Sequence, residues 1–422
     1  MTKYRAIYPE LINSLRDEMT AELRNHILPF WIELAVDSKN GGFLGRIDGN
    51  NEKDVEADKS IILNARLLWT FSAAYRVLGD KIYLRFAEKT YEYMENHFYD
   101  SQYGGFYWLL DHKGDPSVSK KHIYAQAFAI YGYSEFARAT GRREPIERAV
   151  ETFGLIETFA NNEALGGYHE AFSRDWEPAA DARLSDGDKD EQRSMNTHLH
   201  IMEAYSNLYR VNRSPELATK LVSITELMLN NIYNSETTHF DTFFDETWQS
   251  KADFYSYGHD IEAAWLLLDA AEVLEDQGLI SRAQDVTSRV GYSTMNEGID
   301  KQTGGVYNTG INGHPLDKDY HWWVQAEAIV GFLYSFEITN DNSFLETSAS
   351  IWRFIKRFVK DDECGEWFFR LDEFGNPYHG EDKIGPWKCP YHNSRACLVL
   401  FERFSDVDES VSKIAKENSK IS

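Results

Sequence analysis

Three short segments of the chain combine histidine with acidic or amide residues. They read NTHLH, YGHDIE and PYHN, and they hold Asn196 and His200, His259 and Glu262, and His392. Histidine can accept and return a proton near neutral pH, and a nearby carboxylate can hold the ring in one tautomer. These residue types therefore predict acid–base chemistry, with the histidines as proton carriers.

Each segment lies near the start of a helix that is apolar on more than one face. Six such helices are predicted, and they read ILNARLLWTFSAAYR, IYAQAFAIYGYSEFA, NTHLHIMEAYSNLYR, HDIEAAWLLLDAAE, WVQAEAIVGFLYSFE and HNSRACLVLFERF. Aligned on their small and apolar residues, they place polar side chains in one column, namely Arg66, Gln126, His200, Glu262, Glu327 and Arg395. Three or four residues earlier stand Asn196, His259, Trp323 and His392. Residues at this spacing share a helix face, so six helix starts would form a polar ring.

Each of these residues also has a simpler interpretation. A single histidine on an apolar helix is more often a hydrogen-bonded core residue, and Trp323 alone would be core. Arg66 alone would be half of an ion pair with an acid such as Glu262. The common register favours a functional ring, because buried charge is costly unless it has a partner or a purpose.

A sixfold repeat explains how the ring is built. Glycine pairs followed by apolar or aromatic residues begin at Gly41, Gly104, Gly166 and Gly304, and weaker copies read HFDTFFDE and CGEWFFR. The copies are 60 to 73 residues apart, a period typical of stacked supersecondary units. A more amphipathic helix precedes each glycine turn, and the aromatic residues suggest a short hairpin. The prediction is an all-α (α/α)6 barrel of six outer–inner helix pairs, with short β-hairpin turns at one end.

Composition limits the possible partners. The net charge of −24 opposes binding to nucleic acid or to an anionic membrane, and no apolar run is long enough for a membrane span. The 11 tryptophans and 24 tyrosines are mostly core, although such residues also stack on sugar rings. Three cysteines without ligand-like spacing suggest a reducing, cytoplasmic compartment. No Pro/Ser-rich linker divides the chain, so residues 1–422 are expected to form one catalytic domain, as a monomer or weak dimer.

At these residues the sequence resembles the N-acylglucosamine 2-epimerase superfamily and, within it, the cellobiose 2-epimerases. The matching segments span nearly the whole chain and read GGFLGRID, ILNARLLWTFSAAYR, KKHIYAQAFAIYGYSEFAR, SMNTHLHIMEAYSNLYRV, YGHDIEAAWLLLDAAEVL, HWWVQAEAIVGFL and WKCPYHNSRACL. The resemblance implies the same barrel fold. It also implies a set of catalytic residues, His259, His392, His200 and Arg66, and a set that binds substrate, Asn196, Glu262, Trp322, Trp323, Glu327 and Trp387.

The resemblance assigns roles within these sets. His259 and His392 are the two acid/base groups, with Glu262 as the orienter of His259, and Arg66 and His200 contact the reacting oxygens. A single histidine combined with rotation of the intermediate would also serve. Trp323 and Trp387 stack on sugar rings, with Trp322 and Glu327 nearby. Asp188 or Asp190 reaches a second sugar.

The expected reaction is C2 epimerisation of the reducing-end glucose of a β-1,4-linked disaccharide such as cellobiose, through ring opening and a cis-enediolate. No cofactor and no metal are expected, since Arg66 and Arg395 would repel a cation. An aldose–ketose isomerase such as a mannose isomerase, or an N-acylglucosamine 2-epimerase, remains an alternative. From other classes, a glycoside hydrolase would need two carboxylates, for which Glu262 and Glu327 are the candidates, and a glycan-binding protein would need no histidine pair.

Overall fold

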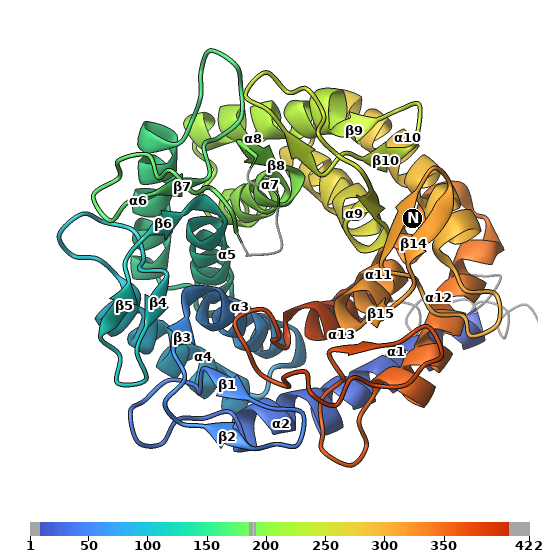
Figure 1. Cartoon of the computed structure of the whole chain (residues 1–422), viewed down its shortest axis with the longest axis horizontal. Coiled ribbons are helices and arrows are strands. Elements are labelled where there is room, and N and C mark those ends of the chain that lie inside the picture. The colour runs from blue at the N-terminus through green and yellow to red at the C-terminus, as the bar shows by residue number, and fades with distance from the viewer. Residues whose placement is uncertain (1–8, 185–188, 190, 405–422) are drawn as a thin grey trace, which may run out of the picture.

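The computed structural model describes residues 9–184, 189 and 191–404. Six inner helices stand side by side around a central axis, each in contact with the next, and the last packs against the first (Figure 1). They are α3 (Ile61–Leu78), α5 (Ile123–Thr140), α7 (Met195–Tyr209), α9 (Tyr257–Leu274), α11 (Trp322–Thr339) and α13 (Tyr391–Phe404). All six predicted inner helices are therefore present, and they close a ring.

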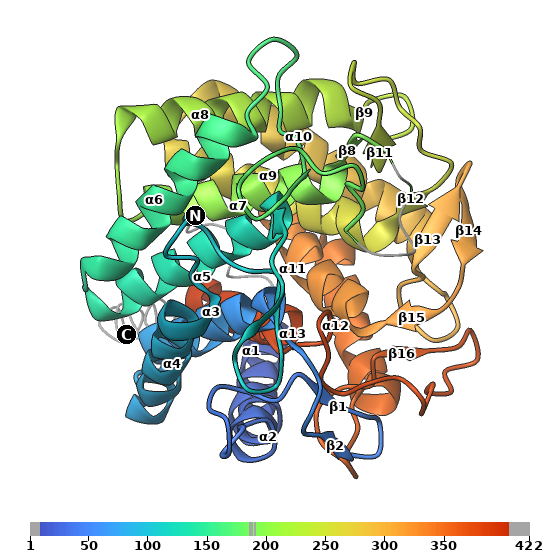
Figure 2. The same cartoon turned by 60° about the vertical axis from the view of Figure 1, so that its left-hand side comes forward.

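The outer helices cover the ring from outside (Figures 1 and 2). They are α1 (Pro9–Glu22) with α2 (Leu28–Glu33), α4 (Lys81–Tyr93), α6 (Glu144–Phe159), α8 (Pro215–Leu227), α10 (Gln277–Ser293) and α12 (Asn342–Phe354). A single turn of π-helix follows four of them, at 94–98, 228–232, 294–298 and 355–359, and another joins α1 to α2 at 23–27. The predicted (α/α)6 barrel is confirmed.

Local sequence sets the limits of the inner helices. Ser60, Ser194 and Ser256 cap the starts of α3, α7 and α9, where each side-chain oxygen accepts a backbone N–H that the helix leaves unpaired. Gly79 and Gly141 end α3 and α5 in the left-handed conformation that glycine adopts without strain. Between these ends nearly every residue of α3 and α5 is buried, because the helices pack against neighbours, the outer layer and the barrel interior.

The strands all lie at the end of the barrel where the inner helices begin (Figure 2). They are β1 (Arg46–Ile47), β2 (Lys53–Asp54), β3 (Lys59–Ser60), β4 (Leu109–Leu110), β5 (Pro116–Val118), β6 (Lys121–His122), β7 (Ala171–Phe172), β8 (Arg193–Ser194), β9 (Tyr233–Asn234), β10 (His239–Phe240), β11 (Phe243–Phe244), β12 (Tyr255–Ser256), β13 (Thr309–Ile311), β14 (His314–Asp317), β15 (Tyr320–His321) and β16 (Arg370–Leu371).

The predicted short hairpins are present at the glycine turns, and further strands pair between neighbouring repeats. Most glycine turns are closed by a single antiparallel bridge, such as Tyr99 with Phe106. The strand that leads into an inner helix pairs with a strand of the following repeat, as β3 does with β4, β6 with β7 and β15 with β16. Each repeat therefore positions the start of the preceding inner helix, and this pairing ties the mouth of the barrel together.

Other sequence expectations can be checked against the fold. Within the described residues no helix is long and apolar enough to cross a membrane. Cys364, Cys389 and Cys397 are all free, and the last two are buried. The expected N-terminal helix begins at Pro9, and the residues before it lie outside the described part of the chain.

Candidate active site

A cavity of about 230 Å³ opens at the end of the barrel where the inner helices begin. Nine of the ten residues expected to form the site line it: Arg66, Asn196, His200, His259, Glu262, Trp322, Trp323, Trp387 and His392. The tenth, Glu327, is fully buried beneath the cavity and contacts His392. Asp188 and Asp190, expected near a second sugar, lie outside the described residues.

The two expected acid/base histidines approach the cavity from different helices and share one neighbour. The ring of His259, on α9, has its centroid 4.7 Å from that of Trp323, and the ring of His392, on α13, lies 5.6 Å from it. Both histidines therefore face the same space against one indole. Burial lowers the pKa of both, to about 3 for His259 and well below its ordinary value for His392. Both rings are neutral at neutral pH and can accept a proton.

The orienting carboxylate for His392 is Glu327. Its Oε1 atom lies 2.7 Å from Nδ1 of His392, which requires a proton on Nδ1 and leaves Nε2 of the neutral ring as the acceptor. Glu262 was predicted to orient His259, but the structure does not show this contact. Glu262 lies 3.8 Å from His392 Nδ1, and among the described residues no hydrogen bond joins it to His259.

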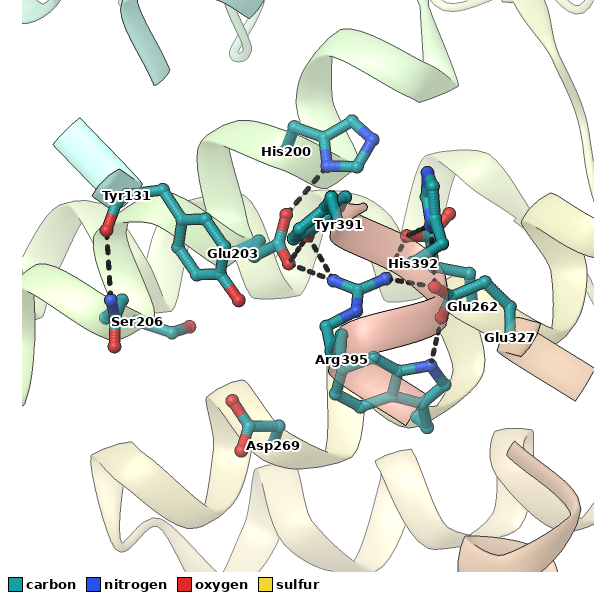
Figure 3. A network of polar contacts seen from close by, with 12 residues as sticks. Tyr131, His200, Glu203, Ser206, Glu262, Asp269, Glu327, Tyr391, His392 and Arg395 are labelled. Atoms are coloured by element: carbon teal, nitrogen blue, oxygen red, sulfur yellow. Dashed lines mark hydrogen bonds and ion pairs between the residues drawn. The ribbon is translucent and has the colours of Figure 1, made fainter. Parts of the chain in front are cut away.

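His200 is oriented in the same way by a residue that the sequence interpretation missed. Nδ1 of His200 lies 2.8 Å from Oε2 of Glu203, three residues later on the same face of α7 (Figure 3). The other oxygen of Glu203 accepts from the hydroxyl of Tyr391 and from the guanidinium of Arg395. The i, i+3 spacing of the two side chains in HIME was the only sequence signal for this pair.

Arg395 joins three buried carboxylates from three helices (Figure 3). Its guanidinium donates to Glu203, to Glu262 at 2.5 Å and to Glu327 at 2.6 Å. Burial disfavours the charged form of all three acids. Arg395 and His200 nevertheless lower the pKa of Glu203 to about 2, whereas burial prevails at Glu262 and Glu327 and raises their pKa. These fixed contacts make a rigid polar layer under the cavity.

The same polar layer contains three residues that could act as metal ligands. Ligand atoms of Glu262, Glu327 and His392 lie within 4.8 Å of one another, which could suit an ion. However, Arg395 already donates to both carboxylates, so a guanidinium supplies the positive charge that a metal would bring. This agrees with the sequence argument that arginine in the ring opposes a cation, and the absence of a metal remains a prediction.

Arg66 crosses the wall of the cavity without an acidic partner. One of its terminal nitrogens donates to the hydroxyl of Tyr124 at 2.8 Å, and its guanidinium lies 4.2 Å from the ring centre of Phe128. No carboxylate of the described residues pairs with it, so the alternative of an ion pair with Glu262 does not apply. Asn196 Oδ1 is likewise buried and lacks a hydrogen-bond partner in the described structure. A bound polar ligand would satisfy such groups.

Aromatic residues form the remaining walls. Trp322 packs on Phe369, with ring centres 4.7 Å apart, and Trp387 stands edge-on to Tyr124 at 6.1 Å. Tyr124, Leu184 and Phe369 also line the cavity, and the sequence pattern did not identify them.

One member of the predicted polar column was placed wrongly. Arg66, His200, Glu262 and Glu327 are each the sixth residue of their helices, and Arg395 is the fifth residue of α13. Gln126, however, is the fourth residue of α5, and the sixth is Phe128. The side chain of Gln126 binds the backbone of Phe106 in the glycine turn. Gly132 and several alanines in α5 made a two-residue shift of the alignment equally plausible.

Comparisons with known proteins agree with this fold. The family model described as N-acylglucosamine 2-epimerase (GlcNAc 2-epimerase) matches residues 42–396. A cellobiose 2-epimerase from Bacteroides fragilis is 47% identical over 386 residues, covering 92% of this chain and 98% of the relative. One from Dictyoglomus turgidum is 37% identical over 390 residues, with 92% and 98% covered. The solved structure of cellobiose 2-epimerase from Bacillus thermoamylovorans B4167 matches with a TM-score of 0.87 and 38% identity, covering 93% of this chain and all of that one. The chain belongs to the N-acylglucosamine 2-epimerase family.

Proposed function

We propose that this enzyme is a carbohydrate epimerase that interconverts glucose and mannose at the reducing end of β-1,4-linked disaccharides, as a cellobiose 2-epimerase does. The observation that carries the proposal is the pair His259 and His392, which face one cavity from two helices. Epimerisation at C2 needs a proton to leave one face of a carbon and another to arrive on the opposite face. Two imidazoles on either side of that carbon provide this, one as the neutral base and the other carrying the proton that it delivers.

The reaction begins with opening of the sugar ring. The proton of the C1 hydroxyl moves to the ring oxygen as the bond between C1 and that oxygen breaks, which leaves an aldehyde. One imidazole then takes the proton from C2, and the electron pair of that bond moves onto the C1 oxygen to give a cis-enediolate. The other imidazole, carrying a proton from solvent, delivers it to C2 on the opposite face.

Arg66 and His200 stabilise the negative charge of the intermediate. Arg66 is a permanent cation without a carboxylate partner, so its charge is available to the enediolate oxygens. His200 is fixed by Glu203 and presents its second ring nitrogen to the cavity. Asn196 adds a side-chain oxygen that can accept from a sugar hydroxyl. Preorganised groups of this kind usually contribute the largest part of catalysis.

A disaccharide suits the site better than a single sugar. Trp323 and Trp387 line the cavity, where an indole can stack on pyranose C–H groups. A second cavity of about 280 Å³ adjoins the first and shares Asn196, His259 and Trp323 with it, which provides room beyond one sugar ring. The small-molecule partner is therefore expected to be a disaccharide.

Three other functions are less well supported. A mannose isomerase would use the same enediolate and differ only in returning the proton to C1, and no particular contact favours an acetamido sugar. A glycoside hydrolase needs two carboxyl groups about 5 Å or more apart that flank the bond. Glu262 and Glu327 both bind Arg395 and have oxygen atoms within 4.8 Å of one another, so they cannot flank a substrate.

Proton NMR of cellobiose in deuterated water with the enzyme tests the proposal. The expected result is mannose at the reducing end, with deuterium at C2. Formation of a ketose would indicate the isomerase, free glucose would indicate a hydrolase, and unchanged cellobiose would contradict catalysis on this substrate.

The remaining expectations are also proposals. We propose that residues 1–422 act as one catalytic domain, since α13 packs against α3 and α1. A cytoplasmic location is supported by the three free cysteines. A monomer or weak dimer, without cofactor, nucleic acid or membrane partner, agrees with the net charge of −24.

A further inference from the structure

Two of the six glycine turns lack their second glycine, and they are the turns that precede α9 and α13. The repeats align by a shared backbone hydrogen bond, from Gly104 N to Asp100 O in one repeat and from Thr238 N to Asn234 O in another. Gly365 N makes the same bond to Asp361 O. The residue after each of these donors is Gly105, His239 and Glu366, respectively.

In three of the four repeats with two glycines, a neutral side chain of the inner helix hydrogen-bonds to the backbone of the turn, and we call this contact a neutral lock. Gln126 accepts from the backbone N–H of Phe106 and donates to its carbonyl, both at 2.9 Å. Gln325 holds Val306 in the same way, at 2.8 and 2.7 Å. A Cβ on Gly105 would stand 2.8 Å from the side-chain oxygen of Gln126, so this lock requires glycine.

In the repeat of α9, charged side chains hold the turn instead, and we call this arrangement a charged lock. Asp260 accepts from the backbone N–H of Phe240 at 2.8 Å, and its other oxygen lies 2.7 Å from Nδ1 of His239. Nε2 of His239 lies 3.2 Å from Glu297, and the ring of Tyr255 stacks on the imidazole at 3.5 Å. Carboxylates thus face both ring nitrogens. Burial opposes a charged ring, but Asp260 and Glu297 outweigh it and raise the pKa of His239.

The repeat of α13 uses a different charged lock at the same place. Oε1 of Glu366 accepts from the side chain of Asn393 at 2.7 Å and from that of Lys388 at 2.9 Å. Oε2 accepts from the indole of Trp31 at 2.7 Å. Glu366 and Lys388 are almost completely buried, so this ion pair is shielded from solvent.

Each charged lock binds the residue directly after an acid/base histidine. Asp260 follows His259, and Asn393 follows His392. We infer that His239 and Glu366 are positioning residues, whose buried hydrogen-bonded contacts with Asp260 and Asn393 hold the helix starts that carry the two histidines. The inference rests on the proposed function.

Charge-assisted hydrogen bonds give these two turns a firmer hold on the inner helix than the neutral contacts of the other repeats. They are shorter and about twice as strong as neutral ones, and a fully paired buried network has little freedom to shift. A displacement of about 1 Å at a reacting group can lower a rate about 100-fold. The starts of α9 and α13 carry the two histidines that transfer protons. A rigid contact at these two places should therefore have the largest effect on the rate.

The test replaces each charged lock by the neutral one of the other repeats. The variants are His239→Gly with Asp260→Gln, and Glu366→Gly with Asn393→Gln. The measurements are kcat and KM for cellobiose epimerisation and the isotope effect on kcat with C2-deuterated cellobiose. We expect kcat to fall about 10-fold or more, KM to stay within about twofold, and the isotope effect to rise because proton transfer becomes slower.

In the repeat of α7, His198 accepts from the backbone N–H of Tyr168 at 3.0 Å and forms the neutral lock. The matched control is His198→Gln, which converts this lock into the Gln form and should leave all three quantities unchanged. The isotope effect does not depend on the fraction of active protein, so a purely structural loss would not move it. If a double variant fails to fold, His239→Gln and Glu366→Gln replace it, since they remove charge with little change of size. Folded variants with the wild-type kcat and isotope effect would overturn the inference. Failure of the proposed function would instead appear as no epimer from the wild-type enzyme.

Discussion

His392 is held by Glu327 through a hydrogen bond of 2.7 Å between Nδ1 and Oε1. The same carboxylate accepts from Arg395 at 2.6 Å and from the indole of Trp265 at 3.1 Å. The other two groups hydrogen-bonded to this carboxylate, Arg395 and Trp265, can act only as donors. The carboxylate therefore decides that Nδ1 of His392 keeps its proton and that Nε2 serves as the base.

Replacement of Glu327 by Gln should lower kcat about 100-fold or more with little change in folding. In either orientation, the glutamine amide points its NH2 group at a donor that the carboxylate had accepted from. His392 therefore loses its fixed tautomer or its alignment. Steady-state kinetics with cellobiose provide the measurement. Glu337→Gln, which alters a partly exposed ion pair with Arg403 outside the cavity, is the control and should retain the wild-type kcat. An active Glu327→Gln variant would remove the orienting role.

The variants His259→Ala and His392→Ala should each abolish epimer formation, because each removes the proton carrier of one face. NMR in deuterated water can follow both the epimer and the label at C2. His314→Ala changes an exposed histidine on β14 and should behave like the wild type. Near-normal turnover in one of the two variants would favour a single histidine with rotation of the intermediate.

Replacement of Trp387 by Ala should raise KM for cellobiose more than KM for glucose or mannose. The indole offers stacking area to a second sugar ring, which a monosaccharide lacks. Parallel kinetics on the disaccharide and the monosaccharides measure the difference. An equal effect on both would place Trp387 beside the reacting sugar instead.

The stability of the protein should depend on pH through His198. Its Nδ1 donates to the carbonyl of Ser194 and its Nε2 accepts from Tyr168, so the folded protein needs the neutral ring. Burial lowers the pKa of His198 from about 6.5 to about 4. Between these values the unfolded chain binds the extra proton, and the free energy of unfolding falls as pH falls, by about 1.4 kcal/mol per pH unit.

The His198→Gln variant should lose that part of the pH dependence, because glutamine accepts the equivalent backbone N–H in the repeats of Gln126 and Gln325 and does not titrate. Chemical unfolding at several pH values between 7 and 4.5 compares the two proteins. Parallel curves for the variant and the wild type would contradict a neutral buried His198.

Activity should survive prolonged treatment with a strong chelator. Arg395 neutralises Glu262 and Glu327 and occupies the place of a cation. Kinetics before and after chelation measure this, with metal content checked by elemental analysis. Loss of activity that returns with one added divalent ion would reverse the conclusion.

Much of the barrel can be read from the sequence because it is encoded locally. Helical periodicity and the glycine–aromatic turns repeat every 60 to 73 residues, and each repeat indicates one outer–inner pair. Sixfold repetition then implies a closed ring, and polar residues near six helix starts must meet at its mouth. For this reason nine of the ten expected site residues do line one cavity.

Contacts across the axis were decided only by the tertiary structure. Glu203 on α7 meets Tyr391 and Arg395 on α13, nearly 190 residues later, and Glu327 rather than Glu262 reaches His392. Such pairs depend on the rotation of each helix and on the reach of each side chain into a shared space. Spacing along one chain determines the face on which a residue lies, but it does not determine which residue of a distant helix stands opposite.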